Sequence, residues 1–240
     1  IDPKRIRKHL DQGQVVVVAG FQGTNPAEDI ATLGRGGSDT TAVALAAALK
    51  ADRCQILKDV DGVFTANPRV VPSARKLDEI AYEEMLELAS AGSEVLQSRA
   101  VEFAKNYGVV LEVLSSFEVK PGTLVREEDK EMEQMIIRGI AADKNQAKAT
   151  LLGVPDTPGV AARIFKALAA ANINVDMIVQ NVSAAGVTDV SFTVAKDDIA
   201  KTKRTIEPLV KQIQAAGLSF DGDIAKVSLV GVGMKSHSGV

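Results

Sequence analysis

Short apolar runs rich in β-branched residues alternate with helical patterns along the first half of the chain. The run Gln14–Gly20 contains four consecutive valines, which is typical of a buried strand in a parallel sheet. Similar runs follow at residues 53–58 and 109–114. This alternation predicts a layered α/β domain with a mainly parallel sheet. The helical patterns lie at residues 3–11, 40–51, 82–88 and 100–107.

The second half carries an internal repeat of one strand pattern. Residues 148–154 read Lys-Ala-Thr-Leu-Leu-Gly-Val, and residues 226–232 echo them as Lys-Val-Ser-Leu-Val-Gly-Val. Pro158 suits the first turn of the helix that follows the first copy. We therefore expect a ferredoxin-like βαββαβ unit and a second copy that stops at its first helix. The elements expected after the first strand are a helix at 158–171, strands at 174–180 and 188–194, and a helix at 199–216.

A run of charged residues separates the two halves. Residues 126–133 carry seven charged side chains and one methionine, a composition typical of a solvated linker. The expected division is therefore a first domain at 1–125, a linker at 126–135, a second domain at 136–222 and the start of a third at 223–240. The chain begins at Ile1 rather than methionine, and we expect it to be truncated at both ends.

Composition excludes several kinds of partner. The formal net charge of -3 and the absence of a Lys/Arg block argue against a nucleic-acid or membrane partner. One cysteine, Cys54, and two histidines, His9 and His237, cannot build a disulfide framework or a Cys/His metal cluster. Apolar runs fall far short of the roughly 20 residues needed to span a bilayer. A reducing, cytoplasmic setting is the default expectation.

The stretch Gly34–Ala42 concentrates the clearest chemistry. Three glycines, an arginine and small hydroxyl residues lead directly into a strong helix former, so that main-chain N–H groups and a positive helix end can face an anion together. Asp39 could orient lysines or a metal there, and Arg35 could grip a carboxylate with its planar fork. The alternative is a tight turn in which Ser38 or Asp39 caps the helix. Neither the GxGxxG nor the Walker pattern fits this stretch.

A second constellation spans Lys58–Arg69. Two aspartates after a strand end, a glycine turn, an aromatic residue and an arginine make a plausible nucleotide platform, with Phe64 near a base and Arg69 on phosphate. A hairpin with exposed charges explains the same spacing equally well. A third candidate is the loop Pro155–Gly159, whose N–H groups could hold an amino acid's carboxylate while Asp156 takes its ammonium group. A well-capped turn is the alternative there.

Further motifs extend these segments into a longer pattern. The first half contains Phe21-Gln-Gly, Thr32–Asp39, Asp59–Thr65, Asn67-Pro-Arg69, Ser115-Ser116 and Pro121–Leu124. The second half contains Gly153–Gly159, Asn172–Met177, Gln180-Asn181 and Lys226–His237. Together they resemble the aspartate kinases of the amino acid kinase superfamily, with paired C-terminal ACT regulatory domains. Two independent motif sets occur in the family's order and cover essentially the whole chain.

The resemblance implies an αβα sandwich followed by ferredoxin-like ACT domains. It also implies ATP-dependent phosphorylation of L-aspartate to 4-phospho-L-aspartate, assisted by Mg²⁺, as the first step of lysine, threonine and methionine biosynthesis. Asp39 would organise the catalytic groups, and Phe21, Arg35 and Ser38 would bind aspartate. The residues expected to hold the nucleotide are Lys58, Asp59, Phe64 and Arg69.

The resemblance further implies feedback control by lysine or threonine. The effector residues at matching positions are Asp156, Pro158, Gly159, Asn174, Asp176, Gln180 and Asn181. Paired ACT domains imply a homodimer or a hetero-oligomer with a regulatory subunit.

Two features depart from the family pattern. The lysine motif Lys-Phe/Tyr-Gly-Gly is absent, so this chain alone is expected to be inactive, and Glu94 stands where the family often has lysine. These departures keep open a non-catalytic amino-acid sensor with a degenerate kinase fold. A different enzyme of the same fold should lack the ACT repeat.

Overall fold

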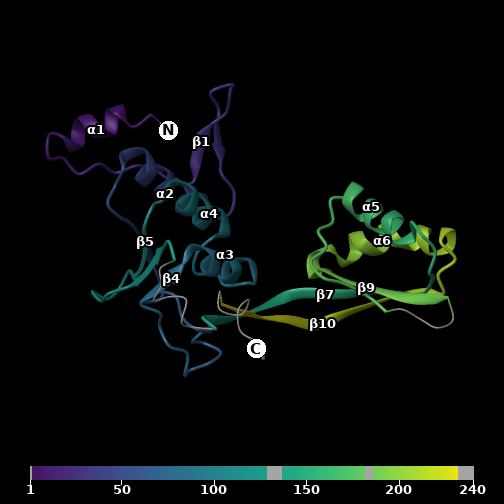
Figure 1. Cartoon of the computed structure of the whole chain (residues 1–240). Helices are drawn as coiled ribbons and strands as arrows, with labels where there is room; N and C mark the ends of the chain where they lie inside the picture. Colours follow the sequence, from purple (N-terminus) through teal and green to yellow (C-terminus); the bar gives the residue numbers. More distant parts are fainter. Residues whose placement is uncertain (1, 129–136, 182–185, 232–240) are drawn as a thin grey trace. The chain divides into compact units, whose positions relative to one another are not determined.

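The structure is a computed structural model that describes residues 2–128, 137–181 and 186–231 (Figure 1). The chain forms two compact units, one built from the segment up to Ala142 together with the segment from Val227, and the other from Asp143–Lys226. Each unit has its own hydrophobic core. The expected α/β class is confirmed.

A four-stranded sheet forms the centre of the first unit, in the order β3-β5-β6-β4. The pairs β3–β5 and β4–β6 are parallel, and β5–β6 is antiparallel, so the sheet is mainly parallel as expected. A separate antiparallel hairpin joins β1 and β2. The elements are α1 (Lys4–Leu10), β1 (Gln22–Thr24), β2 (Ile30–Thr32), α2 (Gly37–Leu49), β3 (Cys54–Lys58), β4 (Glu79–Ala81), α3 (Tyr82–Ser90), α4 (Ser98–Tyr107), β5 (Leu111–Ser115) and β6 (Thr123–Arg126).

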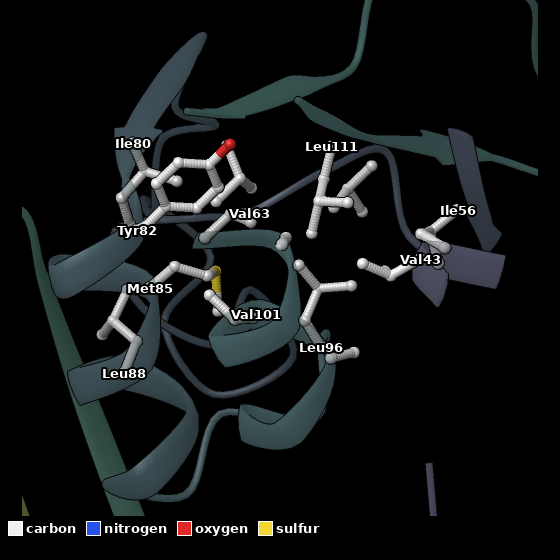
Figure 2. Packing of buried hydrophobic residues seen from close by; sticks show 14 of the residues in the cluster. Val43, Ile56, Val63, Ile80, Tyr82, Met85, Leu88, Leu96, Val101 and Leu111 are labelled. Atoms are coloured by element: carbon white, nitrogen blue, oxygen red, sulfur yellow. The ribbon is translucent and has the colours of Figure 1, made fainter. Parts of the chain in front are cut away.

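Helices α2, α3 and α4 pack on one face of this sheet. Figure 2 shows Val43 of α2, Met85 of α3 and Val101 of α4 gathered with side chains from the strands. Along β3 the burial alternates, with Cys54 and Ile56 in the core and Gln55 and Leu57 exposed, as a strand with one covered face requires. The covered face holds the start of α2 beside the end of β3.

The valine run Gln14–Gly20 is not a strand, and the prediction of a buried parallel strand is wrong for the described structure. Val15 and Val17 are 93% and 94% exposed. A parallel strand exists only when a neighbour takes its backbone hydrogen bonds, and none of the sheets formed by the described residues includes this run. Apolar β-branched composition favours a strand but does not supply the partner.

The second unit is a ferredoxin-like βαββαβ fold, as predicted. Its sheet has the order β10-β7-β9-β8, with β9 antiparallel to both β7 and β8. Helices α5 and α6 lie together over one face (Figure 1), where Ile164, Leu168 and Ile206 are fully buried. The elements are β7 (Gly139–Pro155), α5 (Val160–Ala170), β8 (Ile178–Gln180), β9 (Val187–Ala195), the short 3-10 turn η2 (Lys196–Asp198), α6 (Ile199–Gln212) and β10 (Gly217–Val230).

Helix α5 begins later than expected. Gly159 is its N-cap, with a φ of 92°, so Pro158 precedes the helix instead of occupying its first turn. Glycine adopts left-handed backbone without steric cost, which explains why the helix begins directly after Gly159.

The predicted domain boundaries fall on segments that the structure describes only in part. Strand β6 ends at Arg126, and most of the expected linker lies outside the described residues. The strand expected to open a second ACT domain is the end of β10, and residues 232–240 lie outside the described residues. The division at 125, 135 and 222 therefore stays a prediction.

Candidate functional site

The glycine-rich loop enters helix α2 through left-handed backbone. Gly34 and Gly36 have φ values of 78° and 69°, a region that favours glycine. Gly36 is the N-cap, and as a glycine it has no side chain with which to cap the helix. Ser38 and Asp39 lie inside the first turn, so the alternative in which either residue caps the helix is wrong. The hydroxyl of Thr40 donates to the Gly36 carbonyl at 2.9 Å, which is a bond back along the helix and not an N-cap.

Asp39 and Lys58 form the central ion pair of the site. Lys58 Nζ lies 3.1 Å from Asp39 Oδ1 and 3.0 Å from Oδ2, joining the first turn of α2 to the last residue of β3. The two side chains are 10% and 25% exposed, respectively. Two residues predicted from separate motifs are thus brought together, and the amine is held at the carboxyl end of a parallel strand, where α/β proteins bind ligands.

The same carboxylate affects a neighbouring thiol. Burial, and secondarily the negative charge of Asp39, raise the pKa of Cys54 to about 11. Cys54 is buried at the start of β3 and stays a neutral packing residue near neutral pH.

Phe21 packs against the start of α2. A Cβ placed on Gly37 would lie 3.0 Å from the Phe21 ring and 2.9 Å from Leu33 Cβ, so only glycine allows this approach. The Phe21 amide donates to Thr41 Oγ1 at 3.3 Å. Arg35 on the loop and Ser38 in the first turn of α2 are both exposed. The aspartate-binding residues expected from the sequence therefore surround one helix end.

The segment 59–69 has the features of the hairpin alternative, and its role in nucleotide binding stays a prediction. Residues 63–65 pair antiparallel with residues 75–77, and Phe64 forms a bridge with Lys76 inside this hairpin. Asp59 and Arg69 form an ion pair of 3.0 Å, with side chains 68% and 76% exposed. The structure thus joins Lys58 to Asp39 and Arg69 to Asp59. Phe64 is partly buried in the hairpin.

Sequence reasoning missed residues that hold the loop. Thr41 accepts the Phe21 amide, and Arg99 Nη1 donates to the Leu33 carbonyl at 3.0 Å. Thr41 belongs to the stretch Gly34–Ala42, and a hydroxyl beside a glycine loop could have indicated a residue that holds the loop by a hydrogen bond. Arg99 lies 66 residues from Leu33 along the chain, and no spacing rule connects them.

The loop Pro155–Gly159 borders a hollow of about 340 Å³ in the second unit. Four of the expected effector residues line it, and Val154, Val160 and Val190 add apolar walls. The hollow combines a carboxylate with the N-terminal end of α5, and the positive end of a helix suits a carboxylate ligand. These four residues are Asp156, Pro158, Gly159 and Gln180.

The other three expected effector residues do not line this hollow. Asp176 accepts a hydrogen bond from Lys226 Nζ, and the Asn181 carbonyl accepts one from the Thr188 hydroxyl. Asn174 is exposed. Their expected role, completing a site between paired ACT domains, stays a prediction.

Two kinds of feature are absent from the described part of the chain. No group of three or more His, Cys, Asp or Glu side chains gathers there in a way that could hold a metal ion. Among the same residues, no helix is long and apolar enough to cross a membrane.

Comparison with known sequences matches both halves of the chain to families. The profile of the amino acid kinase family matches residues 1–115, and an ACT domain profile matches residues 150–208. The first match covers the glycine loop and the Lys58–Arg69 segment. The second covers the hollow.

Whole-chain relatives and solved structures agree with these matches. Aspartate kinase of Pseudomonas putida is 58% identical over all of this chain and 59% of its own length. Aspartokinase III of E. coli, solved with aspartate and ADP, is 32% identical with a TM-score of 0.79, covering 99% of this chain and 53% of that one. Its complex with lysine and aspartate gives a TM-score of 0.72 at 32% identity, over 95% of this chain and 50% of the other.

The chain spans about three-fifths of the length of the curated relatives that it matches (59% for the Pseudomonas putida enzyme). Within that span, the order of the two family matches, the fold of both units and the sequence identity all agree. The chain belongs to the aspartate kinase family, with an amino acid kinase domain followed by an ACT domain.

Proposed function

We propose that the protein uses ATP to phosphorylate the side-chain carboxylate of L-aspartate, giving 4-phospho-L-aspartate and ADP. The observation that carries the proposal is the Asp39–Lys58 pair, which joins the glycine loop to the end of β3 at 3.0 Å. The solved relative with aspartate and ADP supports this choice of substrates. In the reaction, an oxygen of the substrate carboxylate attacks the γ-phosphorus while the bond from that phosphorus to the β,γ-bridging oxygen breaks.

Phosphoryl transfer requires mainly positioning and charge neutralisation. Asp39 fixes the direction of the Lys58 amine through both carboxylate oxygens. We assign Lys58 to the transferring phosphoryl group and Asp39 to the orientation of that amine. Because an amine held at its place needs no reorganisation during the reaction, it stabilises the developing charge more effectively than a mobile one.

The loop before α2 is assigned to the amino-acid substrate. Arg35 would grip a substrate carboxylate in a bidentate fork, and Ser38 would donate a hydrogen bond beside it. Phe21, 44% exposed and packed on Gly37, would cover the apolar side of the substrate.

The segment after β3 is assigned to the nucleotide. Arg69 would pair with phosphate and Phe64 would lie near the base, with Asp59 orienting Arg69. ATP in such sites carries Mg²⁺, which neutralises phosphate charge when bound. Such an ion would be held mainly by the nucleotide phosphates, with a few carboxylates or waters completing its shell.

The hollow beside α5 is assigned to an amino-acid effector, lysine or threonine. Asp156 would take the effector's ammonium group, and the N–H groups after Gly159 its carboxylate. The solved relative with lysine and aspartate supports such an effector. We further propose that ACT domains pair between subunits, in a homodimer or with a separate regulatory subunit.

The test of the reaction is ADP release by the protein as encoded in full, with L-aspartate and with L-glutamate. Aspartate-dependent turnover is expected, and Arg35→Ala should raise the KM for aspartate about tenfold or more because a charged hydrogen-bond pair is lost. Arg53→Ala is the matched control, since Arg53 lies before β3 and pairs with Glu112 at 2.9 Å. No aspartate-dependent ADP release would refute the proposed reaction and favour a non-catalytic amino-acid sensor.

The test of regulation is the same assay with lysine and threonine, each alone and together. We expect inhibition that Asp156→Asn weakens about tenfold, because the ammonium partner is lost. Asp221→Asn is the control, an exposed aspartate of β10 outside the hollow. Equal inhibition of both variants would remove Asp156 from the effector site.

A further inference from the structure

The glycine loop is tied to two helices by a relay of hydrogen bonds. Thr41 Oγ1 on α2 accepts the Phe21 amide, and the Phe21 carbonyl accepts the Leu33 amide at 2.9 Å. The Leu33 carbonyl then accepts a hydrogen bond from Arg99 Nη1 at 3.0 Å. Leu33 directly precedes Gly34, so the relay ends where the left-handed backbone begins.

The same end of α4 also packs directly on the loop. A Cβ on Gly36 would lie 2.2 Å from Gln97 Cγ and 2.5 Å from Gln97 Cβ. Gln97 is the N-cap of α4, and Arg99 lies in its first turn. One side chain therefore fixes the loop by close packing and the other by a charged hydrogen bond.

From this arrangement we propose that Arg99 is a positioning residue for the amino-acid substrate. It holds the Leu33 carbonyl, and through it the segment Gly34–Ser38, which presents Arg35 and Ser38. The inference rests on the proposed function for the identity of the substrate. It goes beyond that function by placing a determinant of substrate binding on α4.

The loop needs such an anchor because its glycine-rich backbone is conformationally flexible. Gly34, Gly36 and Gly37 leave the backbone with more freedom than any other residue would, and Arg35 stands between two left-handed glycines. Without an external anchor, substrate binding would have to order this backbone, at a cost in affinity. Arg99 orders it beforehand. The nucleotide segment 59–69 takes no part in these hydrogen bonds, so we expect the larger effect on the amino-acid substrate.

The test compares Arg99→Ala with Arg99→Lys in the full-length protein. Arg99→Ala should raise the KM for aspartate about tenfold, the loss expected for a hydrogen bond from a charged donor, while the KM for ATP stays within about twofold. Arg99→Lys keeps a charged donor and should recover most of the affinity. Lys105→Ala is the control, because Lys105 lies at the other end of α4 and pairs with Glu83 at 2.7 Å.

Hydrogen exchange provides a readout that does not require turnover. The Leu33 and Gly37 amides, which donate to Phe21 and Gly34, should exchange about tenfold faster in Arg99→Ala than in the Lys105→Ala control. If the wild-type protein shows no aspartate-dependent ADP release, the proposed function fails while the exchange data still decide the role of Arg99.

Two outcomes would overturn the inference. Unchanged exchange together with an unchanged KM for aspartate would show that the loop needs no anchor on α4. An equal rise in both KM values, or a fall in kcat alone, would assign Arg99 to general stability instead.

Discussion

Two aspartate–cation pairs flank the end of β3, and they differ in how far water reaches them. Asp39–Lys58 and Asp59–Arg69 both close at 3.0 Å. The side chains of the first pair are 10% and 25% exposed, and those of the second 68% and 76%. Water screens the attraction between the charges of the second pair, so this pair contributes little to stability despite its short distance. The first pair lies in a medium of lower dielectric constant, where the attraction is stronger.

The comparison shows that equal distances do not imply equal roles. A partly buried pair fixes the direction of an amine and is sensitive to the loss of either partner. An exposed pair can open at little cost, which suits the role on a ligand's phosphate that we propose for Arg69. The lower exposure of the first pair favours a pair that stays closed, and the exposure of the second fits its proposed exchange of partners.

The largest expected effect is on turnover when the buried pair is broken. Lys58→Met should lower kcat by about a thousandfold, because a fixed positive charge at the transferring group is lost and Asp39 is left without its partner. Arg53→Met, at the opposite end of the strand, serves as the control for a lost surface pair. Activity of Lys58→Met within tenfold of wild type would contradict the central role of this pair.

A pair with even less exposure extends the comparison to stability. Arg138 Nε lies 3.2 Å from Glu84 Oε2, and the side chains are 6% and 2% exposed. Arg138→Met should lower the free energy of unfolding by about 3 kcal/mol, because it leaves a buried carboxylate without its cation. Urea unfolding of this variant and of Arg138→Met/Glu84→Gln checks the prediction. The double variant should be the more stable of the two, and a single variant as stable as wild type would refute it.

Cys54 reports the environment of the buried pair through pH. Its folded-state pKa of about 11 exceeds the ordinary value of 9.0, so the folded protein binds the thiol proton more tightly than the unfolded chain. This contribution to stability is fully present below pH 9 and is lost as the pH rises towards 11. Denaturant unfolding at increasing pH should therefore show a steeper loss in wild type than in Cys54→Val. Parallel curves for the two proteins would contradict the shift.

The smallest expected effect on stability concerns the exposed pair. Arg69→Ala should change the free energy of unfolding by less than about 1 kcal/mol, since an exposed pair is screened by water and salt. The same variant should raise the KM for ATP severalfold and leave the KM for aspartate unchanged. Thermal unfolding and initial rates measure the two effects, and a large stability loss would place this pair in the same class as Asp39–Lys58.

The sequence predicted much of this molecule where local pattern and tertiary structure agree. Helix α4 ends at Gly108, with a φ of 64°, because glycine accepts the left-handed C-cap. The βαββαβ order of the second unit followed from alternation and turn signals. The Asp39–Lys58 pair was not predicted as a pair, although each residue was singled out from its own motif.

What could not be predicted depends on partners distant in the chain. The valine run at 15–18 has the composition of a strand, but strand formation depends on a neighbouring strand. The anchoring of the glycine loop by Arg99 depends on the position of α4, which no local rule supplies. The exposure that separates the two aspartate pairs likewise depends on packing between elements rather than on spacing.

The second unit is inserted in the sequence of the first, between Ala142 and Val227. The chain leaves the first unit along β7 and returns along β10, which are neighbours in one sheet, and the Arg138 amide donates to the Val230 carbonyl at 2.7 Å. The entry and exit points thus lie one hydrogen bond apart. A two-residue hairpin turn could therefore close the first unit without the second, and another βαββαβ module with the same spacing of its ends could be exchanged into the same position. The second unit is in this sense modular, and under the proposed function its effector specificity could be changed without rebuilding the unit that carries the Asp39–Lys58 pair.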